Sequence, residues 1–138
     1  MKPELLYSEL EVGRTFEPFT FHLTETLVNE YRTALGVWPQ SVEESESEGR
    51  EIAPAGLWGI WGRQAYLRDY TMPGGGILVG QDMEFSAPVF VGDVLNVQAT
   101  VIEKYENHER KYITIESTAK IDHKLTCGVV RVKAIWPR

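Results

Sequence analysis

Residues Ile52 to Tyr70 read IAPAGLWGIWGRQAYLRDY, and this stretch decides the fold. Pro54 suits a first helical turn, where a missing N–H costs nothing. Apolar residues then recur over more than half of the helix circumference, a pattern typical of a helix that is buried on almost every side. Glycines at positions 56, 59 and 62 each cost a helix about 1 kcal/mol relative to alanine, which is understandable if another backbone comes close. The sequence therefore predicts a long helix over residues 54–70, wrapped by a sheet.

The remainder of the chain supplies the sheet. Residues 72–76, MPGGG, end the helical pattern, and the chain from Ile77 onward reads as strands. Apolar and polar side chains alternate through three runs, residues 95–101, 113–121 and 126–136. In the last run this alternation places Thr126 and Val130 on one face and Cys127 on the other. One long helix followed by antiparallel strands, with no helix between them, indicates an α+β fold and not a βαβ one.

The N-terminal part adds a short strand and a second helix. Phe16, Phe19 and Phe21 predict a first strand, and Pro18 makes it an edge-like strand because proline removes one ladder donor. Thr24 is a suitable N-cap for a helix that follows, in which apolar residues lie three to four apart.

Between this helix and the long one the chain is polar. The helix is expected to end before Gly36, and residues 43–51 then carry five glutamates and one arginine. Charges of one sign repel one another and bury nothing, so we predict a solvated loop. Loops of this length in compact domains often border functional sites.

Length and composition restrict the class of protein. The 138 residues form one predicted domain, 1–138, with ordinary globular contents of apolar and charged residues. The net charge of −6 argues against nucleic acid or an anionic membrane as partner. No run approaches eighteen apolar residues, the N-terminus does not read as a signal peptide, and the lone Cys127 cannot form an intrachain disulfide. We therefore expect a cytoplasmic protein.

Metal and histidine chemistry find little support in the sequence. No Cys/His cluster has zinc-ligand spacing, so no metal is expected. His108 and His123 fall at predicted hairpin tips, where solvated polar residues are common. His22, at the end of the first predicted strand, is the one remaining histidine and a weak candidate for a base.

Two segments resemble a known family. Residues 83–95 read MEFSAPVFVGDVL, and residues 52–56 read IAPAG. The first is similar to the F-x-x-P-V-x-x-G-D-x-L signature of the MaoC-like branch of hot-dog proteins, which includes (R)-specific enoyl-CoA hydratases and 3-hydroxyacyl thioester dehydratases. The second resembles the helix start of that branch, where hydratases show I-x-H-G-like sequences and their degenerate halves show A-P-P-like ones. The resemblance implies a hot-dog fold, a long helix wrapped by a curved antiparallel sheet.

The catalytic motif of the resembled family is not retained. That motif is close to D-x-N-P-x-H in the loop after the first helix, where this chain has GVWPQS over residues 36–41. The proline is present, but Val37 stands for the acid and Ser41 for the histidine. Neither side chain takes up a proton near neutral pH. Glu51, near the start of the long helix, is the carboxylate best placed to substitute, and His22 and Ser41 are the other weak catalytic candidates.

Substrate binding is expected around the start of the long helix. Unpaired N–H groups of Ala55, Gly56 and Leu57 would present positive potential to a thioester carbonyl. Arg63 is expected to pair with Asp82 or Glu84 or to reach a ligand phosphate. Three tryptophans are candidates for lining an acyl tunnel, although packing in the core explains them equally well; they are Trp38, Trp58 and Trp61.

Three functions remain open at this point. The resemblance implies an acyl-thioester protein, with its ligand on coenzyme A or acyl carrier protein, no cofactor, and a homodimer or a heterodimer with another hot-dog chain. It would be a non-catalytic partner subunit or an enzyme with an altered site. The second function is a thioesterase or biosynthetic tailoring enzyme that uses a carboxylate, Glu51 or Asp69. The third is a dimerising module without chemistry.

Overall fold

The computed structural model describes residues 2–35, 58–122 and 124–137, and for residues 32, 35 and 58–60 it describes the backbone alone. Its elements are the 3-10 helix η1 (Tyr7–Glu9), β1 (Phe19–His22), α1 (Glu25–Leu35), α3 (Trp58–Leu67), β2 (Ile77–Phe85), β3 (Val94–Asn107), β4 (Arg110–Ile121) and β5 (Leu125–Trp136). The strands form one antiparallel sheet in the order β1-β3-β4-β5-β2. The predicted α+β layout is confirmed.

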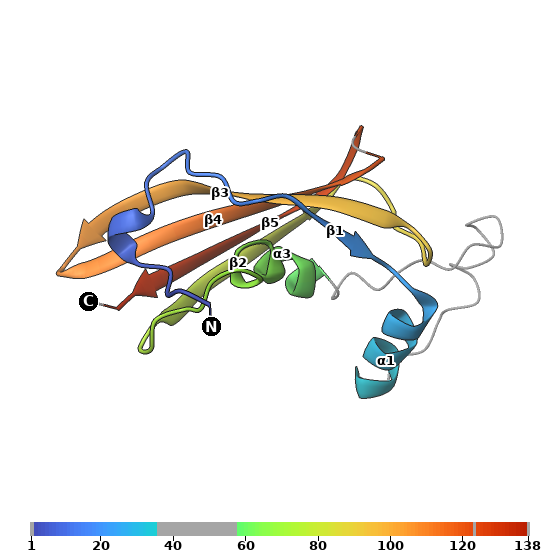
Figure 1. Cartoon of the computed structure of the whole chain (residues 1–138), viewed down its shortest axis with the longest axis horizontal. Coiled ribbons are helices and arrows are strands. Elements are labelled where there is room, and N and C mark those ends of the chain that lie inside the picture. Colours follow the sequence, from blue (N-terminus) through green and yellow to red (C-terminus); the bar gives the residue numbers. More distant parts are fainter. Residues whose placement is uncertain (1, 36–57, 123, 138) are drawn as a thin grey trace.

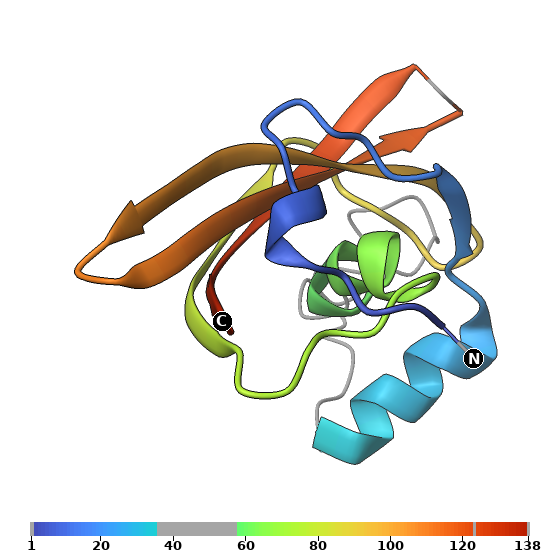
Figure 2. The ribbon, with the colours of Figure 1, turned by 60° about the vertical axis from the view of Figure 1, so that its left-hand side comes forward.

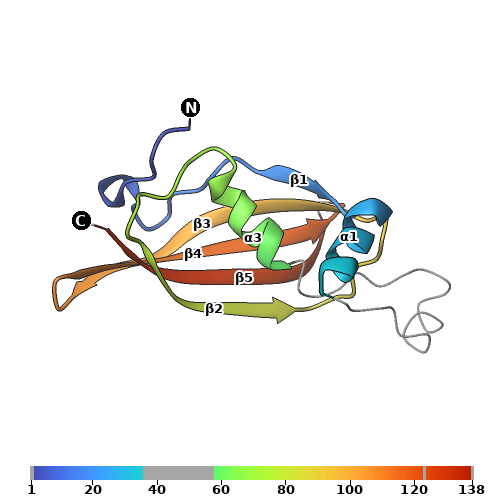
Figure 3. The same cartoon turned by 90° about the horizontal axis from the view of Figure 1, so that it is seen from below.

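The sheet curves around α3, which lies along its inner face (Figures 1 and 3). Figure 2 shows α3 under the arch of the sheet and α1 away from it. Within the described part of the chain, no helix is long and apolar enough to cross a membrane.

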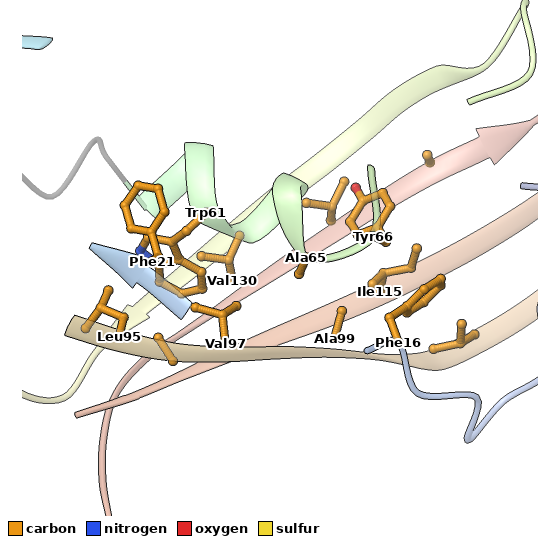
Figure 4. Packing of buried hydrophobic residues seen from close by; sticks show 14 of the residues in the cluster. Phe16, Phe21, Trp61, Ala65, Tyr66, Leu95, Val97, Ala99, Ile115 and Val130 are labelled. Carbon is orange, nitrogen blue, oxygen red and sulfur yellow. The ribbon is translucent and has the colours of Figure 1, made fainter. Parts of the chain in front are cut away.

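The core fills the space between α3 and the sheet. On β3 the alternation predicted from the sequence is confirmed, because Leu95, Val97, Ala99 and Val101 are all fully buried. Trp61, from α3, packs into the same cluster (Figure 4). Further buried residues come from β4 and β5; they include Ile113, Ile115, Ala119, Val130, Val132, Ala134 and Trp136.

One glycine sets the distance between α3 and the sheet. A Cβ built on Gly62 would lie 2.9 Å from Cγ1 of Val130, closer than real Cβ contacts. The buried Ser117 hydroxyl donates a 2.8 Å hydrogen bond to the Gly62 carbonyl. The helix therefore touches β4 and β5 with its backbone, which confirms the close approach predicted for Gly62. Gly56 lies outside the described residues, and only the backbone of Gly59 is described.

The N-terminal segment covers the open end of the core. Leu5 and Leu10 are buried there, and the Trp136 indole N–H donates a 2.7 Å hydrogen bond to the Leu5 carbonyl. The Leu5 N–H donates to the Thr71 carbonyl and the Thr71 N–H donates to the Pro3 carbonyl, which attaches the same segment to the chain that leaves α3.

The predicted start of α1 is confirmed, and the predicted end of α3 is corrected. Thr24 caps α1 as predicted, because its Oγ1 accepts a 3.1 Å hydrogen bond from the Leu27 N–H. Helix α3 ends at Leu67, earlier than the predicted residue 70. Among its described side chains, burial is one-sided: Trp61 and Ala65 are buried, whereas Arg63 and Gln64 are exposed.

Two strand predictions need correction. Phe16 lies outside β1, which begins at Phe19, and the segment before Pro18 meets the sheet by an isolated bridge of Thr15 with Thr100. Cys127 lies on the inner face, not the outer one. The register shifts from Ala119↔Gly128 to Lys120↔Thr126, so Cys127 is an extra bulged residue. Because the bulge adds one residue to β5, the side chains before it point to the opposite faces from those that strict alternation predicts.

We expect Gly62→Ala to lower the free energy of unfolding by about 1 to 2 kcal/mol, because the overpacking cost exceeds the gain in helix propensity. Urea denaturation measures this change. Gly80→Ala is the matched control, since a Cβ at Gly80 meets nothing within 4 Å. Equal stability of the two variants would contradict the close contact of α3 with β5.

Cys127 should be chemically inert in the folded protein. Burial raises the pKa of its thiol from 9.0 to about 11, so the thiolate fraction near pH 8 falls about 100-fold relative to the unfolded chain. A chromogenic disulfide reagent should therefore react at least about 100-fold more slowly in buffer than in urea. Rapid reaction of the folded protein would show that Cys127 faces solvent.

Candidate functional site

Most of the residues predicted for the site lie outside the described part of the chain. These are Trp38, Ser41, Glu51, Ala55, Gly56 and Leu57. Trp58 is the first residue of α3, and only its backbone is described. The part of the site that the structure describes is therefore the rest of α3 and the hollows beside it.

The remaining catalytic candidate, His22, does not point toward α3. It is the last residue of β1, is exposed, and alternates with the inward-facing Phe21. Trp61 has no exposed surface and lies beside Phe21 and Val130 on the inner side of the sheet (Figure 4). The structure therefore does not bring His22 and Trp61 together.

Acidic candidates near the helix are engaged elsewhere. Asp69 follows the end of α3 and forms a 2.9 Å ion pair with Arg68. Glu84 forms a 3.0 Å ion pair with Arg131 on the outer face of the sheet, so the expected pairing of Arg63 with Glu84 is wrong. Among the described residues, Arg63 has no carboxylate partner.

Arg63 instead contacts Tyr66, three residues along the same face of α3. The Arg63 side chain is close enough to the Tyr66 phenol to affect its pKa. Burial raises the pKa of Tyr66 above its ordinary value of 10.0, and the positive charge and hydrogen bond of Arg63 offset part of that rise. The pair puts one cation and one hydroxyl at the boundary between core and solvent.

An apolar chamber opens beside this pair, between α3, β2 and β5. Its volume is about 110 Å³. The lining residues come from α3, from the segment after it and from three strands; they are Arg63, Tyr66, Leu67, Met72, Gly76, Leu78, Ile115, Val132, Ala134 and Trp136. Polar atoms of side chains reach it at Arg63 and Tyr66, because the Trp136 N–H is turned to the Leu5 carbonyl.

A shallow basic groove adjoins the chamber on the solvent side of α3. It is lined by Lys2, Arg63, Gln64, Leu67 and Arg68 and holds about 540 Å³. Lys2 Nζ donates a 3.1 Å hydrogen bond to the Leu67 carbonyl near the end of α3. Groove and chamber share Arg63 and Leu67, so the two hollows adjoin each other at these residues.

The segment that resembles the family signature is a structural turn. Gly92 has a φ of 98°, a conformation that favours glycine. The Asp93 carboxylate accepts a 2.9 Å hydrogen bond from the Phe90 N–H, and the Gly92 N–H donates to the Leu23 carbonyl at 2.7 Å. The turn thereby fastens the start of β3 to the chain between β1 and α1.

Strand β2 is an edge of the sheet with apolar side chains in solvent. Ile77, Leu78, Val79 and Phe85 are each about half exposed. Among the described residues, β2 pairs with β5 on one side and with no strand on the other. An apolar strand with a free edge favours pairing with another chain.

The fold and this site define a hot-dog protein with an open sheet edge beside its central helix. Among solved structures the chain is similar to (R)-hydratase PhaJ1 from Pseudomonas aeruginosa, with 22% identity, a TM-score of 0.76, and coverage of 96% of this chain and 85% of that one. The MaoC-like dehydratase from Rhodospirillum rubrum gives 16% identity, a TM-score of 0.78 and coverage of 97% of both chains.

A third similar structure is a complex. The chain matches the 3R-hydroxyacyl-ACP dehydratase complex HadBC from Mycobacterium tuberculosis with 16% identity, a TM-score of 0.73, and coverage of 90% of this chain and 96% of that one. No protein-family model and no curated protein matches the sequence. Likeness at these identities establishes the fold.

Sequence reasoning missed the chamber. Arg63 and Tyr66 stand three residues apart, which places them on one helix face, and this spacing was the available signal. The partners of that face, Leu78 and Trp136, are distant in sequence and follow only from the order of the strands.

We expect Arg63→Gln to raise the pKa of Tyr66, because the charge and the hydrogen bond that favour the phenolate are both lost. Tyrosine NMR titration of the folded protein, with Tyr66→Phe for assignment, measures the shift. Arg131→Gln is the control, since Arg131 bonds to Glu116 and Glu84 on the outer face. An unchanged Tyr66 pKa would show that Arg63 does not contact the phenol.

Proposed function

We propose that this protein binds an acyl thioester and acts as the non-catalytic partner subunit of a hydratase or dehydratase. The observation that carries the proposal is the hot-dog fold of hydratases and dehydratases in a chain with valine and serine at the catalytic positions, Val37 and Ser41. The ligand is carried by coenzyme A or acyl carrier protein. The cytoplasm is the proposed location, supported by the free thiol of Cys127.

The two catalytic candidates that the structure describes, His22 and Asp69, support binding without turnover. Hydration of an enoyl thioester requires a carboxylate to activate water and an imidazole to move a proton. His22 is exposed on the outer side of the sheet, and Asp69 is paired with Arg68. The backbone N–H groups of Ala55, Gly56 and Leu57 remain the proposed donors to the thioester carbonyl.

The edge strand β2 supports a second chain as partner. Its exposed apolar side chains, Ile77, Leu78 and Val79, stand beside the chamber of α3. Pairing there would extend the sheet and cover the chamber from outside. The similar structure HadBC is itself a complex, and we propose that a hot-dog chain carrying the missing acid and histidine takes this position.

A dimerising module without ligand is the second candidate. The exposed apolar edge of β2 favours it, because that edge needs only another strand. The thioesterase alternative gains no support from Asp69, whose carboxylate is engaged by Arg68.

Measurements of the binding and the hydration of crotonyl-CoA distinguish these functions. We expect the purified chain to bind crotonyl-CoA in calorimetry, more tightly than coenzyme A alone, and not to hydrate it when the loss of enoyl absorbance is followed. Robust hydration by the chain alone would contradict the non-catalytic assignment. A dimer with no affinity for either ligand would favour the dimerising module.

A further inference from the structure

The chamber and the basic groove differ in chemistry but meet at one residue pair. Leu67 and the stem of Arg63 belong to both linings. The chamber side is apolar and the groove side is cationic. A ligand that occupied both would need an apolar tail and a negative head.

The chamber has room for a short aliphatic chain. Its volume of about 110 Å³ corresponds to about four groups of the size of a water molecule, which takes about 30 Å³. Aliphatic and aromatic walls favour the apolar part of a ligand, because burial removes its apolar surface from water. The inner walls are of this kind: Leu67, Leu78, Ile115, Val132, Ala134 and Trp136. A chain of about four carbons therefore matches the space.

The mouth of the chamber is built for an anion. Arg63 has no carboxylate partner among the described residues, and it lines the chamber together with Tyr66. The Tyr66 hydroxyl is a second group there that can donate to a ligand. Arg68 is balanced by Asp69, but Lys2, bound to a backbone carbonyl, adds positive charge. This local cationic surface stands out in a chain of net charge −6.

The head group that fits best is a carboxylate. A guanidinium binds a carboxylate through paired, charge-assisted hydrogen bonds, whereas an uncharged thioester carbonyl has no need of a full positive charge. A second donor from Tyr66 matches the second carboxylate oxygen.

We propose that this site binds a free, unbranched aliphatic carboxylate of about six carbons, with its tail in the chamber and its carboxylate on Arg63 and Tyr66. The inference stands apart from the proposed thioester function, since the site lies on the C-terminal half of α3 and the thioester proposal rests on residues 55–57.

Titration with hexanoate, followed by amide NMR on the full chain, tests the proposal. We expect saturable shifts centred on Arg63, Leu67, Gly76 and Leu78. Acetate lacks the tail and hexanol lacks the charge, so each should bind at least about tenfold more weakly. Shifts that never saturate, or that centre on another surface, would overturn the proposal.

Two variants test the contact with the ligand's carboxylate and the contact with its tail separately. Arg63→Gln should weaken hexanoate at least about tenfold, and Ala134→Leu should abolish binding by filling the chamber. If thermal unfolding shows that Ala134→Leu is not folded, Leu78→Trp closes the chamber from the exposed edge. Lys120→Gln removes the same charge from the outer strand surface and should bind like the parent.

Unchanged affinity in Arg63→Gln, or in both chamber variants, would overturn the site. Failure here is distinguishable from failure of the thioester proposal. A chain that binds crotonyl-CoA but not hexanoate refutes the carboxylate site alone, and one that binds hexanoate but not crotonyl-CoA refutes the thioester assignment alone.

Discussion

The backbone contact between α3 and the sheet is the constraint on which the rest of the structure depends. Gly62 leaves no space for a side chain against Val130, and Ser117 bonds directly to the Gly62 carbonyl. Because the helix is held this close, Trp61 and Ala65 are driven fully into the core. Protein interiors are close-packed, so a displacement of the helix would also displace the side chains packed beneath it.

The same constraint creates the chamber. Close contact at Gly62 brings the middle of α3 against β4 and β5, while β2 lies farther out at the sheet edge (Figure 3). The space left between the end of the helix and β2 is lined by Leu78, Trp136 and the Arg63–Tyr66 pair. A ligand or a second chain that filled this space would bury the apolar surface of its walls and gain dispersion contacts with them.

Polar chemistry is divided between the two faces of the sheet. The outer face carries ion pairs across neighbouring strands, such as Arg131 with Glu84 and Glu116. The inner face carries few charges, and Arg63 stands where α3 emerges from it. A cation beside an apolar cavity acts more strongly than one on an open surface, because water screens it less.

The sequence by itself determined the element order, the buried face of β3, the Thr24 cap and the close-packed helix. Each of these follows from local periodicity or from the conformational limits of a single residue such as Gly62. Only the tertiary structure decided that Cys127 faces inward, that Glu84 pairs with Arg131 instead of Arg63, and that Tyr66 and Trp136 share a cavity. A bulge, an ion-pair partner and a cavity wall depend on which distant strands become neighbours, and local periodicity carries no information about that choice.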